Sequence, residues 1–283
     1  MSIIQKAVQA QNERRPAHQP GNTGGQTVLP VAADTPHRPA NVAAFVPLGT
    51  NGFLQLEPND PASRSEVRHL KRSILQAAFS PLADRGANIV MITSALPGAG
   101  KTFLSANLAQ ALALERDRTT LLIDADDTRA TLSRALGLHG SPGFFDVLHD
   151  SEFAVESCLY RSDVPGLEFI PAGGHFDGAL ELLTSNRARD VLHKLADENR
   201  NRLVVIDCPP LLGTPNAVAI AALAGQILVV VEAGITSNAV ITQALELLNR
   251  DKPIGLVLNK IPRTPLLTLA NGSYYYYSGP DGD

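Results

Sequence analysis

The sequence predicts an α/β protein with a doubly wound, mostly parallel sheet and helices on both of its faces. Three observations support this fold class. The predicted strands are near-continuous runs of Val, Ile and Leu, which is typical of strands covered on both faces. They alternate with helical patterns along the chain, and a glycine-containing loop joins the first strand to the helix that follows it.

The first element of this pattern is a helix over Ser65–Phe79, where Leu70, Ile74 and Ala78 recur at helical spacing and Pro81 follows. The strands expected after it are Ile89–Thr93, Thr120–Ile123, Leu167–Ile170, Leu203–Ile206, Ile227–Val231 and Ile254–Leu258. The helices expected between them are Thr102–Glu115, Leu180–Glu198, Asn216–Ala224 and Asn238–Asn249.

Composition divides the chain into three parts. Residues 1–62 are rich in Pro, Gly, Gln and Asn without a sustained apolar period, so we expect a disordered tail. Residues 63–266 carry the alternating pattern and form the predicted folded domain. Residues 267–283 break the pattern with turn-forming residues and a run of tyrosines, and we expect an exposed, flexible tail.

Charge and composition exclude several classes of protein. The formal net charge of −4 argues against a broadly basic nucleic-acid binder. The two cysteines, Cys158 and Cys208, are too few for a disulfide framework and lack metal-ligand spacing, so both are expected to pack in the core. The longest apolar runs fall short of the roughly 18 residues of a membrane helix, and the N-terminus does not resemble a signal peptide. A cytoplasmic protein is the expectation.

The loop after the first strand carries the chemistry of a P-loop. It reads Thr93-Ser-Ala-Leu-Pro-Gly-Ala-Gly-Lys-Thr102 and runs into a helix. Gly98 and Gly100 allow backbone N–H groups to surround phosphate oxygens at the positive end of that helix. Lys101 would neutralise phosphate charge, and the Thr102 hydroxyl would bind Mg²⁺. The alternative is a glycine turn that binds no ligand.

Acidic residues follow two of the predicted strands. Asp124 and Asp126 stand after one strand, and Asp207 ends another. Ligands of open parallel sheets lie outside the carboxyl ends of the strands, so these carboxylates are predicted to converge on a metal-bound nucleotide beside the loop. A helix cap is the alternative for any one of them.

Four of the five tyrosines occupy consecutive positions, Tyr274, Tyr275, Tyr276 and Tyr277. So short a turn-rich segment cannot bury four aromatic rings, which argues against a purely structural role. The hypothesis is a cluster of phosphate acceptors, each gaining about −1.5 to −2 charges on modification. An edge strand or a sticky terminal patch is the alternative.

These segments together carry a resemblance to a known family. Residues 93–102, Leu121–Asp126 and Val205–Pro210 resemble the Walker A, Walker A′ and Walker B motifs of bacterial tyrosine kinases, and the tyrosine run resembles their autophosphorylated cluster. The segment Leu112–Asp126 is most similar to stand-alone autokinases of exopolysaccharide and exosortase loci. The resemblance covers about residues 63–283 and implies an ATP-dependent tyrosine autokinase that regulates exopolysaccharide synthesis or export.

The resemblance also implies roles for particular residues. Asp124 would be the base or the orienting group for the incoming tyrosine hydroxyl. The other implied catalytic residues are Lys101, Asp126 and Asp207, and the implied Mg²⁺ ligands are Thr102, Asp126 and Asp207. The implied nucleotide contacts are Pro97, Gly98, Ala99, Gly100, Lys101, Thr102, Phe103 and Asn259. Asn259 would contact adenine, with a strand-end turn residue as the alternative.

The sequence departs from the family pattern at three places. Ala99 stands where the family usually has Glu, and Asn216 stands where it usually has Asp. In the first helix, the family's Glu-x-x-Arg-x-x-Arg oligomerisation motif is matched by Ser65, Arg68 and Lys71, so its acid is missing. A solvated basic face is the alternative interpretation of that helix.

Partners and rival functions follow from the same resemblance. It implies self-association with phosphorylation in trans, activation by a separate inner-membrane co-polymerase, a cognate tyrosine phosphatase, and peripheral attachment at the membrane through the partner. One rival is an ATPase switch of the ParA/MinD type, but Leu96 stands where those proteins carry a signature lysine. The other rival is a catalytically weak scaffold that binds ATP.

Overall fold

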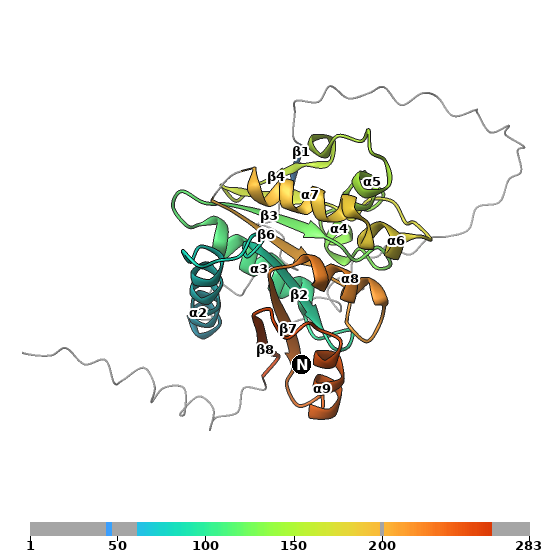
Figure 1. Cartoon of the computed structure of the whole chain (residues 1–283). Helices are drawn as coiled ribbons and strands as arrows, with labels where there is room; N and C mark the ends of the chain where they lie inside the picture. The colour runs from blue at the N-terminus through green and yellow to red at the C-terminus, as the bar shows by residue number, and fades with distance from the viewer. Residues whose placement is uncertain (1–43, 47–60, 199–200, 262–283) are drawn as a thin grey trace, which may run out of the picture.

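The computed structural model describes residues 44–46, 61–198 and 201–261, and within them eight strands form one sheet (Figure 1). The sheet order is β1-β4-β5-β3-β6-β2-β7-β8, with β4 and β5 antiparallel and all other neighbours parallel. The strands are β1 (Ala44–Val46), β2 (Ile89–Ser94), β3 (Thr119–Asp124), β4 (Tyr160–Ser162), β5 (Leu167–Ile170), β6 (Arg202–Asp207), β7 (Gln226–Glu232) and β8 (Ile254–Asn259).

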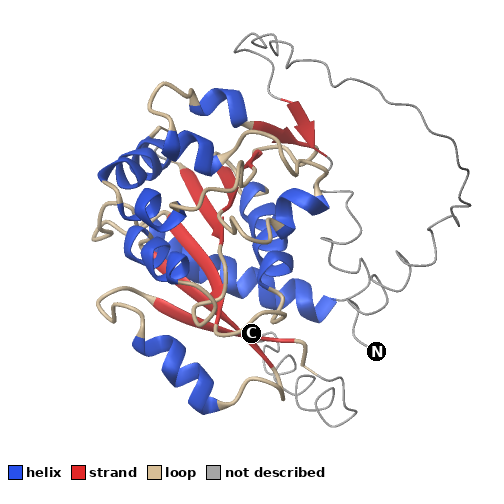
Figure 2. Ribbon diagram, turned by 90° about the vertical axis from the view of Figure 1, so that its right-hand side faces the viewer, coloured by secondary structure: helices blue, strands red, loops and turns tan. Residues whose placement is uncertain are grey.

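Helices cover both faces of this sheet (Figure 2). One face packs against α2 (Pro61–Ala78), α3 (Lys101–Ala113) and α4 (Thr131–Ala135). The opposite face packs against α5 (Phe144–His149), α6 (Ala179–Thr184), α7 (Asn186–Asp197), α8 (Pro215–Leu223) and α9 (Asn238–Glu246). A 3₁₀ turn, η1 (Val155–Cys158), precedes β4. The predicted doubly wound fold class is therefore confirmed.

The burial pattern explains why the central strands read as continuous apolar runs. Every residue of β2 and of β6 is buried. Successive side chains point to opposite faces of a strand, so Val90 and Ile92 pack toward α2 and α3, while Ile89 and Met91 pack toward α8. Both cysteines are buried and free, and burial raises the pKa of the Cys158 thiol to about 12.

The structure adds α4, α5, η1 and β4, which were not predicted, and it differs from the prediction in residues 180–198 and in the N-terminal tail. The single helix expected over residues 180–198 is divided into α6 and α7 at Ser185, whose backbone is extended and whose hydroxyl accepts from the Ala188 N–H. This side-chain cap begins a new helix although the apolar period continues. Residues 44–46, expected in the tail, form β1 beside β4. Residues 61 and 62, also expected in the tail, begin α2. The remaining predictions for the two tails lie outside the described residues.

Helix α2 is anchored on the α3 side of the sheet. Its Ile74 and Ala78 side chains are buried, and the Gln226 amide of β7 donates to the Ile74 carbonyl at 3.3 Å. Across the described ranges, the helices are all too short or too polar to cross a membrane.

The sheet order determines where the predicted functional residues meet. Strands β3, β6 and β2 are consecutive neighbours and run parallel, so their carboxyl ends share one edge of the sheet. The loop that follows β2 and the aspartates that end β3 and β6 therefore lie at the same edge. Strands β7 and β8 continue this edge on the other side of β2.

Candidate active site

The loop between β2 and α3 has the backbone geometry of an anion-binding cradle. Gly98 and Gly100 have φ values of 89° and 96°, in the left-handed region that favours glycine. A side chain added at Gly98 would meet nothing within 4 Å, whereas one added at Gly100 would lie 2.2 Å from Asn259 Nδ2. Helix α3 begins at Lys101, so its positive end faces the loop.

Asp124 and Asp207 are paired neighbours in the register of β3 and β6. Asp124 is fully buried and accepts three hydrogen bonds, from the Asp126 N–H at 3.1 Å, the Ser133 N–H at 2.8 Å and the Ser133 hydroxyl at 2.7 Å. This environment suits an orienting group, because the three donors fix the carboxylate and the segment that carries Asp126.

Asp207 connects the acidic pair to the start of α3. It accepts from the Ser105 hydroxyl at 3.0 Å and from the Thr102 hydroxyl, and it faces the charge of Lys101. Burial raises the pKa of Asp207 to about 6 against the lowering effect of Lys101. Burial and the neighbouring Asp207 raise the pKa of Asp124 to about 7. Burial therefore disfavours the charged form of both carboxyl groups, and for Asp207 the charge of Lys101 acts in the opposite direction.

This donor set fits Mg²⁺ with a nucleotide. Thr102, Asp126 and Asp207 offer oxygen donors, which Mg²⁺ prefers, at the same sheet edge as the loop. Among the described residues, His, Cys, Asp and Glu form no group of three that could enclose a metal. Mg²⁺ usually takes one or two carboxylates and completes its shell with water and substrate phosphates.

Residues around Asp126 explain one departure from the family pattern. Asp126 is 6% exposed and accepts from the Arg129 N–H at 2.9 Å. The next residue, Asp127, accepts from Asn216 Nδ2 at 3.0 Å, and its other oxygen lies 3.8 Å from His175 Nδ1. An aspartate at position 216 would place a second carboxylate against Asp127, whereas the asparagine amide donates to it.

Asn259 lies against the phosphate loop, where its amide donates to the Ala99 carbonyl at 2.8 Å. Its predicted contact with adenine remains a prediction. The next residue, Lys260, donates to the Gly98 carbonyl at 2.7 Å. Of the other loop residues, Pro97 is exposed, while Thr102 and Phe103 are half-buried in the first turn of α3.

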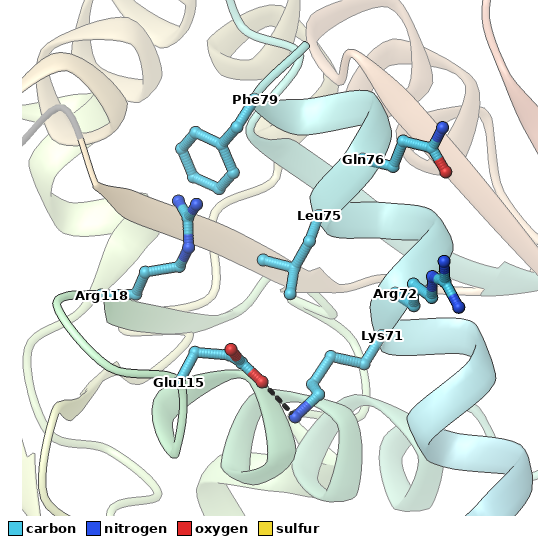
Figure 3. Close-up of a pocket in the computed structure, with 7 residues that line it drawn as sticks. All are labelled: Lys71, Arg72, Leu75, Gln76, Phe79, Glu115 and Arg118. Atoms are coloured by element: carbon cyan, nitrogen blue, oxygen red, sulfur yellow. Dashed lines mark ion pairs between the residues drawn. The ribbon is translucent and has the colours of Figure 1, made fainter.

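A surface pocket of about 540 Å³ lies between α2 and the segment that joins α3 to β3 (Figure 3). In it Lys71 pairs with Glu115, and the Arg118 guanidinium lies 3.6 Å from the centre of the Phe79 ring. Since α3 is about 20 Å long, the pocket is remote from the phosphate loop. Lys71, which matches the last position of the oligomerisation motif, is thus held within its own chain.

The structure brings the loop and the three predicted aspartates together at one sheet edge. Tyr274–Tyr277 lie outside the described residues. Ser133 and Lys260 contact Asp124 and the loop, respectively, and were not predicted from the sequence. Lys260 directly follows the predicted Asn259, which is a usable signal, whereas nothing in the sequence connects Ser133 to Asp124.

A glycine loop, a lysine at a helix start and carboxylates at the carboxyl edge of a parallel sheet define a P-loop nucleotide-binding protein. A family model described as "AAA domain" matches residues 87–253. YwqD of Bacillus subtilis strain 168, named a tyrosine-protein kinase, is 30% identical over 178 residues, which cover 62% of this chain and 73% of YwqD. The chain belongs to the bacterial tyrosine kinase family of P-loop proteins.

Two further comparisons place the chain within that family. EpsB of Ralstonia solanacearum is 38% identical over 175 residues, which are 61% of this chain and 22% of EpsB. The chain thus spans about a fifth of the length of that relative. The solved BceF tyrosine kinase domain has a TM-score of 0.61 and 31% identity, and the match covers 73% of this chain and 81% of that domain.

Proposed function

We propose that this protein is an ATP-dependent tyrosine autokinase that transfers the γ-phosphate of Mg-ATP to Tyr274–Tyr277 and thereby regulates exopolysaccharide synthesis or export. The observation that carries the proposal is the convergence of Lys101, Thr102 and the aspartates at one sheet edge. The relatives' names supply the reaction class, because several are called tyrosine-protein kinases.

In this reaction the tyrosine oxygen forms a bond to the γ-phosphorus while the bond from that phosphorus to the bridging oxygen of ADP breaks. Mg-ATP supplies the phosphoryl group, and ADP leaves with the bridging oxygen. Lys101 and the N–H groups of the loop would bind phosphate oxygens, while Thr102, Asp126 and Asp207 would hold the metal. Catalysis of this kind rests mainly on positioning and charge stabilisation.

The proton of the tyrosine hydroxyl passes to a carboxylate of the acidic cluster, which consists of Asp124, Asp126 and Asp207. Tyrosine has an ordinary pKa of about 10, so a nearby carboxylate assists its deprotonation as the new bond forms. Asp124 is the proposed base or orienting group. Its three hydrogen bonds and complete burial support the orienting role, in which it holds the Asp126 segment toward the incoming hydroxyl.

Partners follow from the same proposal. Phosphorylation in trans requires self-association, so that the tail of one copy enters the site of a neighbour. A separate inner-membrane co-polymerase would activate the kinase and hold an otherwise cytoplasmic chain at the membrane, and a cognate tyrosine phosphatase would reverse the modification. Nucleic acid is not a proposed partner, because the net charge is −4.

A ParA/MinD-type switch receives less support, because Leu96 occupies the position of the signature lysine and is 38% exposed on the loop. A scaffold that binds ATP without transferring phosphate differs from the kinase because it forms no phosphotyrosine. Both rivals predict nucleotide binding without phosphotyrosine, so the product of the reaction separates them from the kinase.

The experiment is incubation of the full chain with Mg²⁺ and γ-³²P-labelled ATP, followed by phosphoamino-acid analysis. We expect labelled phosphotyrosine in the native chain and in Lys194→Ala, a matched variant of an exposed lysine in α7. Lys101→Ala should lose the label by at least about a hundredfold, as for loss of other charge-stabilising groups. Binding of ATP without phosphotyrosine, with a membrane activator present, would contradict the kinase and favour a switch or scaffold.

A further inference from the structure

Two consecutive carbonyl groups of the phosphate loop are held by side chains from the end of β8. Lys260 Nζ donates to the Gly98 carbonyl at 2.7 Å, and Asn259 Nδ2 donates to the Ala99 carbonyl at 2.8 Å. These contacts join segments that are more than 150 residues apart in the sequence. They lie at the loop itself and not at a distant surface.

The direction of a carbonyl determines the direction of the N–H group in the same peptide. A trans peptide is planar, with its C=O and N–H pointing in opposite directions, and the described residues contain no cis peptide bond. A hydrogen bond that holds the Gly98 carbonyl toward β8 therefore points the Ala99 N–H away from β8. The bond to the Ala99 carbonyl does the same for the Gly100 N–H.

The backbone on either side of these peptides supports the same geometry. Gly98 and Gly100 have positive φ values, and successive N–H groups in such a conformation form a concave anion-binding nest. Nothing lies within 4 Å of a side chain placed on Gly98, so the loop is open there. The Ala99 and Gly100 N–H groups are thus available to an anion, while the carbonyls of the same two peptides accept hydrogen bonds from Lys260 and Asn259.

Lys260 is itself held in place. Its backbone has a φ of 58°, which is uncommon for a residue other than glycine. Its ammonium also pairs with Glu232 Oε1 at 2.9 Å, and both side chains are about four-fifths covered, with exposures of 22% and 21%. Glu232 ends β7, and the Ala233 N–H donates to the Asn259 carbonyl at 2.9 Å. The ends of β7 and β8 are therefore joined to each other, and together they support the phosphate loop.

We propose that Lys260, held by Glu232, is a positioning residue that keeps the phosphate loop in its anion-binding conformation, with Asn259 as the second support. Without Lys260 the peptide between Gly98 and Ala99 can rotate and turn its carbonyl oxygen toward the phosphates, which repel it. The inference rests on the proposed function only in taking a nucleotide as the ligand of the loop.

The test is titration of the full-length chain with fluorescently labelled ADP and Mg²⁺. Lys260→Met keeps the length of the side chain but removes the donor, and it should weaken ADP affinity about tenfold, equal to about 1.4 kcal/mol. Lys260→Arg can still donate to the carbonyl and pair with Glu232, so it should restore most of the affinity. In the kinase assay, Lys260→Met should raise KM more than it lowers kcat, because it removes binding common to substrate and transition state.

Lys252→Met is the matched control. Lys252 Nζ also donates to backbone carbonyls, those of Ala221, Ala222 and Ala224, at 3.0, 2.6 and 2.7 Å, but at the end of α8. Its loss should lower the melting temperature and leave ADP affinity unchanged.

Two results would overturn the inference. One is an ADP affinity of Lys260→Met within twofold of the native value. The other is an equal loss of affinity in Lys252→Met, which would reduce the effect to general destabilisation. If the native chain binds ADP in either case, the proposed nucleotide function stands and this inference alone fails. If the native chain does not bind ADP, both fail.

Discussion

Ser133 is the buried hydroxyl that joins three parts of the acidic site, and its removal should be costly. Its side chain donates to Asp124 Oδ2 at 2.7 Å and accepts from the Ala172 N–H at 3.0 Å. It lies at the start of α4, Asp124 ends β3, and Ala172 follows β5. Ser133→Ala therefore removes two hydrogen bonds at a residue that is 1% exposed.

The magnitude follows from these two contacts. An unsatisfied buried N–H, here that of Ala172, costs about 1–3 kcal/mol, and a hydrogen bond to a charged group contributes about 1.5–3 kcal/mol. The two effects share one side chain and do not add fully. We expect Ser133→Ala to lower the free energy of unfolding by about 3 kcal/mol, while the substitution removes a single oxygen and leaves almost no cavity.

The loss should also depend on pH. The Asp124 pKa is raised to about 7 by burial and Asp207, and the Ser133 hydroxyl acts against this rise. Because the folded pKa exceeds the unfolded value of 3.8, the folded chain binds more protons, and stability falls as pH rises toward 7. Removing the hydroxyl steepens that fall, so the cost should be larger at about pH 8 than at about pH 5.5.

Urea unfolding of the metal-free chain in EDTA, followed by circular dichroism at both pH values, measures this cost. Ser157→Ala is the control, because Ser157 is exposed and its hydroxyl only donates to the Ala154 carbonyl. A loss below about 1 kcal/mol at both pH values, or a loss equal to that of the control, would refute the reasoning.

Three further changes test other parts of the account. Asp207→Asn should stabilise the metal-free chain at about pH 8 by up to about 3 kcal/mol, because it removes a buried carboxylate whose pKa is raised to about 6. This gain in stability should disappear at about pH 4, where the carboxyl group of the folded native chain is already protonated. Thermal melts across this range, with Asp177→Asn as the exposed control, check it. Gly100→Ala should weaken ADP binding in a fluorescence titration, because a φ of 96° strains any residue with a side chain and the new Cβ would displace the Asn259 amide from the loop; unchanged binding would contradict the loop geometry. Ile74→Ala should cost about 2–4 kcal/mol in urea unfolding, because this side chain of α2 is 2% exposed and its removal leaves a cavity; a neutral result would mean that α2 is not docked in solution.

Much of the fold follows from local pattern. The strands ending at Asp124 and Asp207 are apolar runs with a carboxylate at the end. In a parallel sheet, this pattern places both acids at one edge. The division of residues 180–198 at Ser185 could not be predicted in this way, because the apolar period continues through the break. A single hydroxyl cap ends one helix and begins the next.

The site was predictable where its residues belong to a continuous motif. The loop and the strand-end acids are of this kind. The contacts of Ser133 with Asp124 and of Lys260 with Gly98 depend on how distant segments pack, which no local pattern records. The role of Asn216 could not be predicted for the same reason, because it depends on the hydrogen bond that its amide donates to Asp127.

Phosphotyrosine mapping by mass spectrometry tests the central claim most directly. Two full-length variants are mixed with Mg-ATP: Lys101→Ala, which keeps the tyrosines, and a chain with Tyr274–Tyr277 changed to Phe, which keeps the kinase site. We expect phosphate on Tyr274–Tyr277 of the Lys101→Ala chain in the mixture, and none when that chain is incubated alone. A native chain that binds ATP but carries no phosphate on these tyrosines would contradict it.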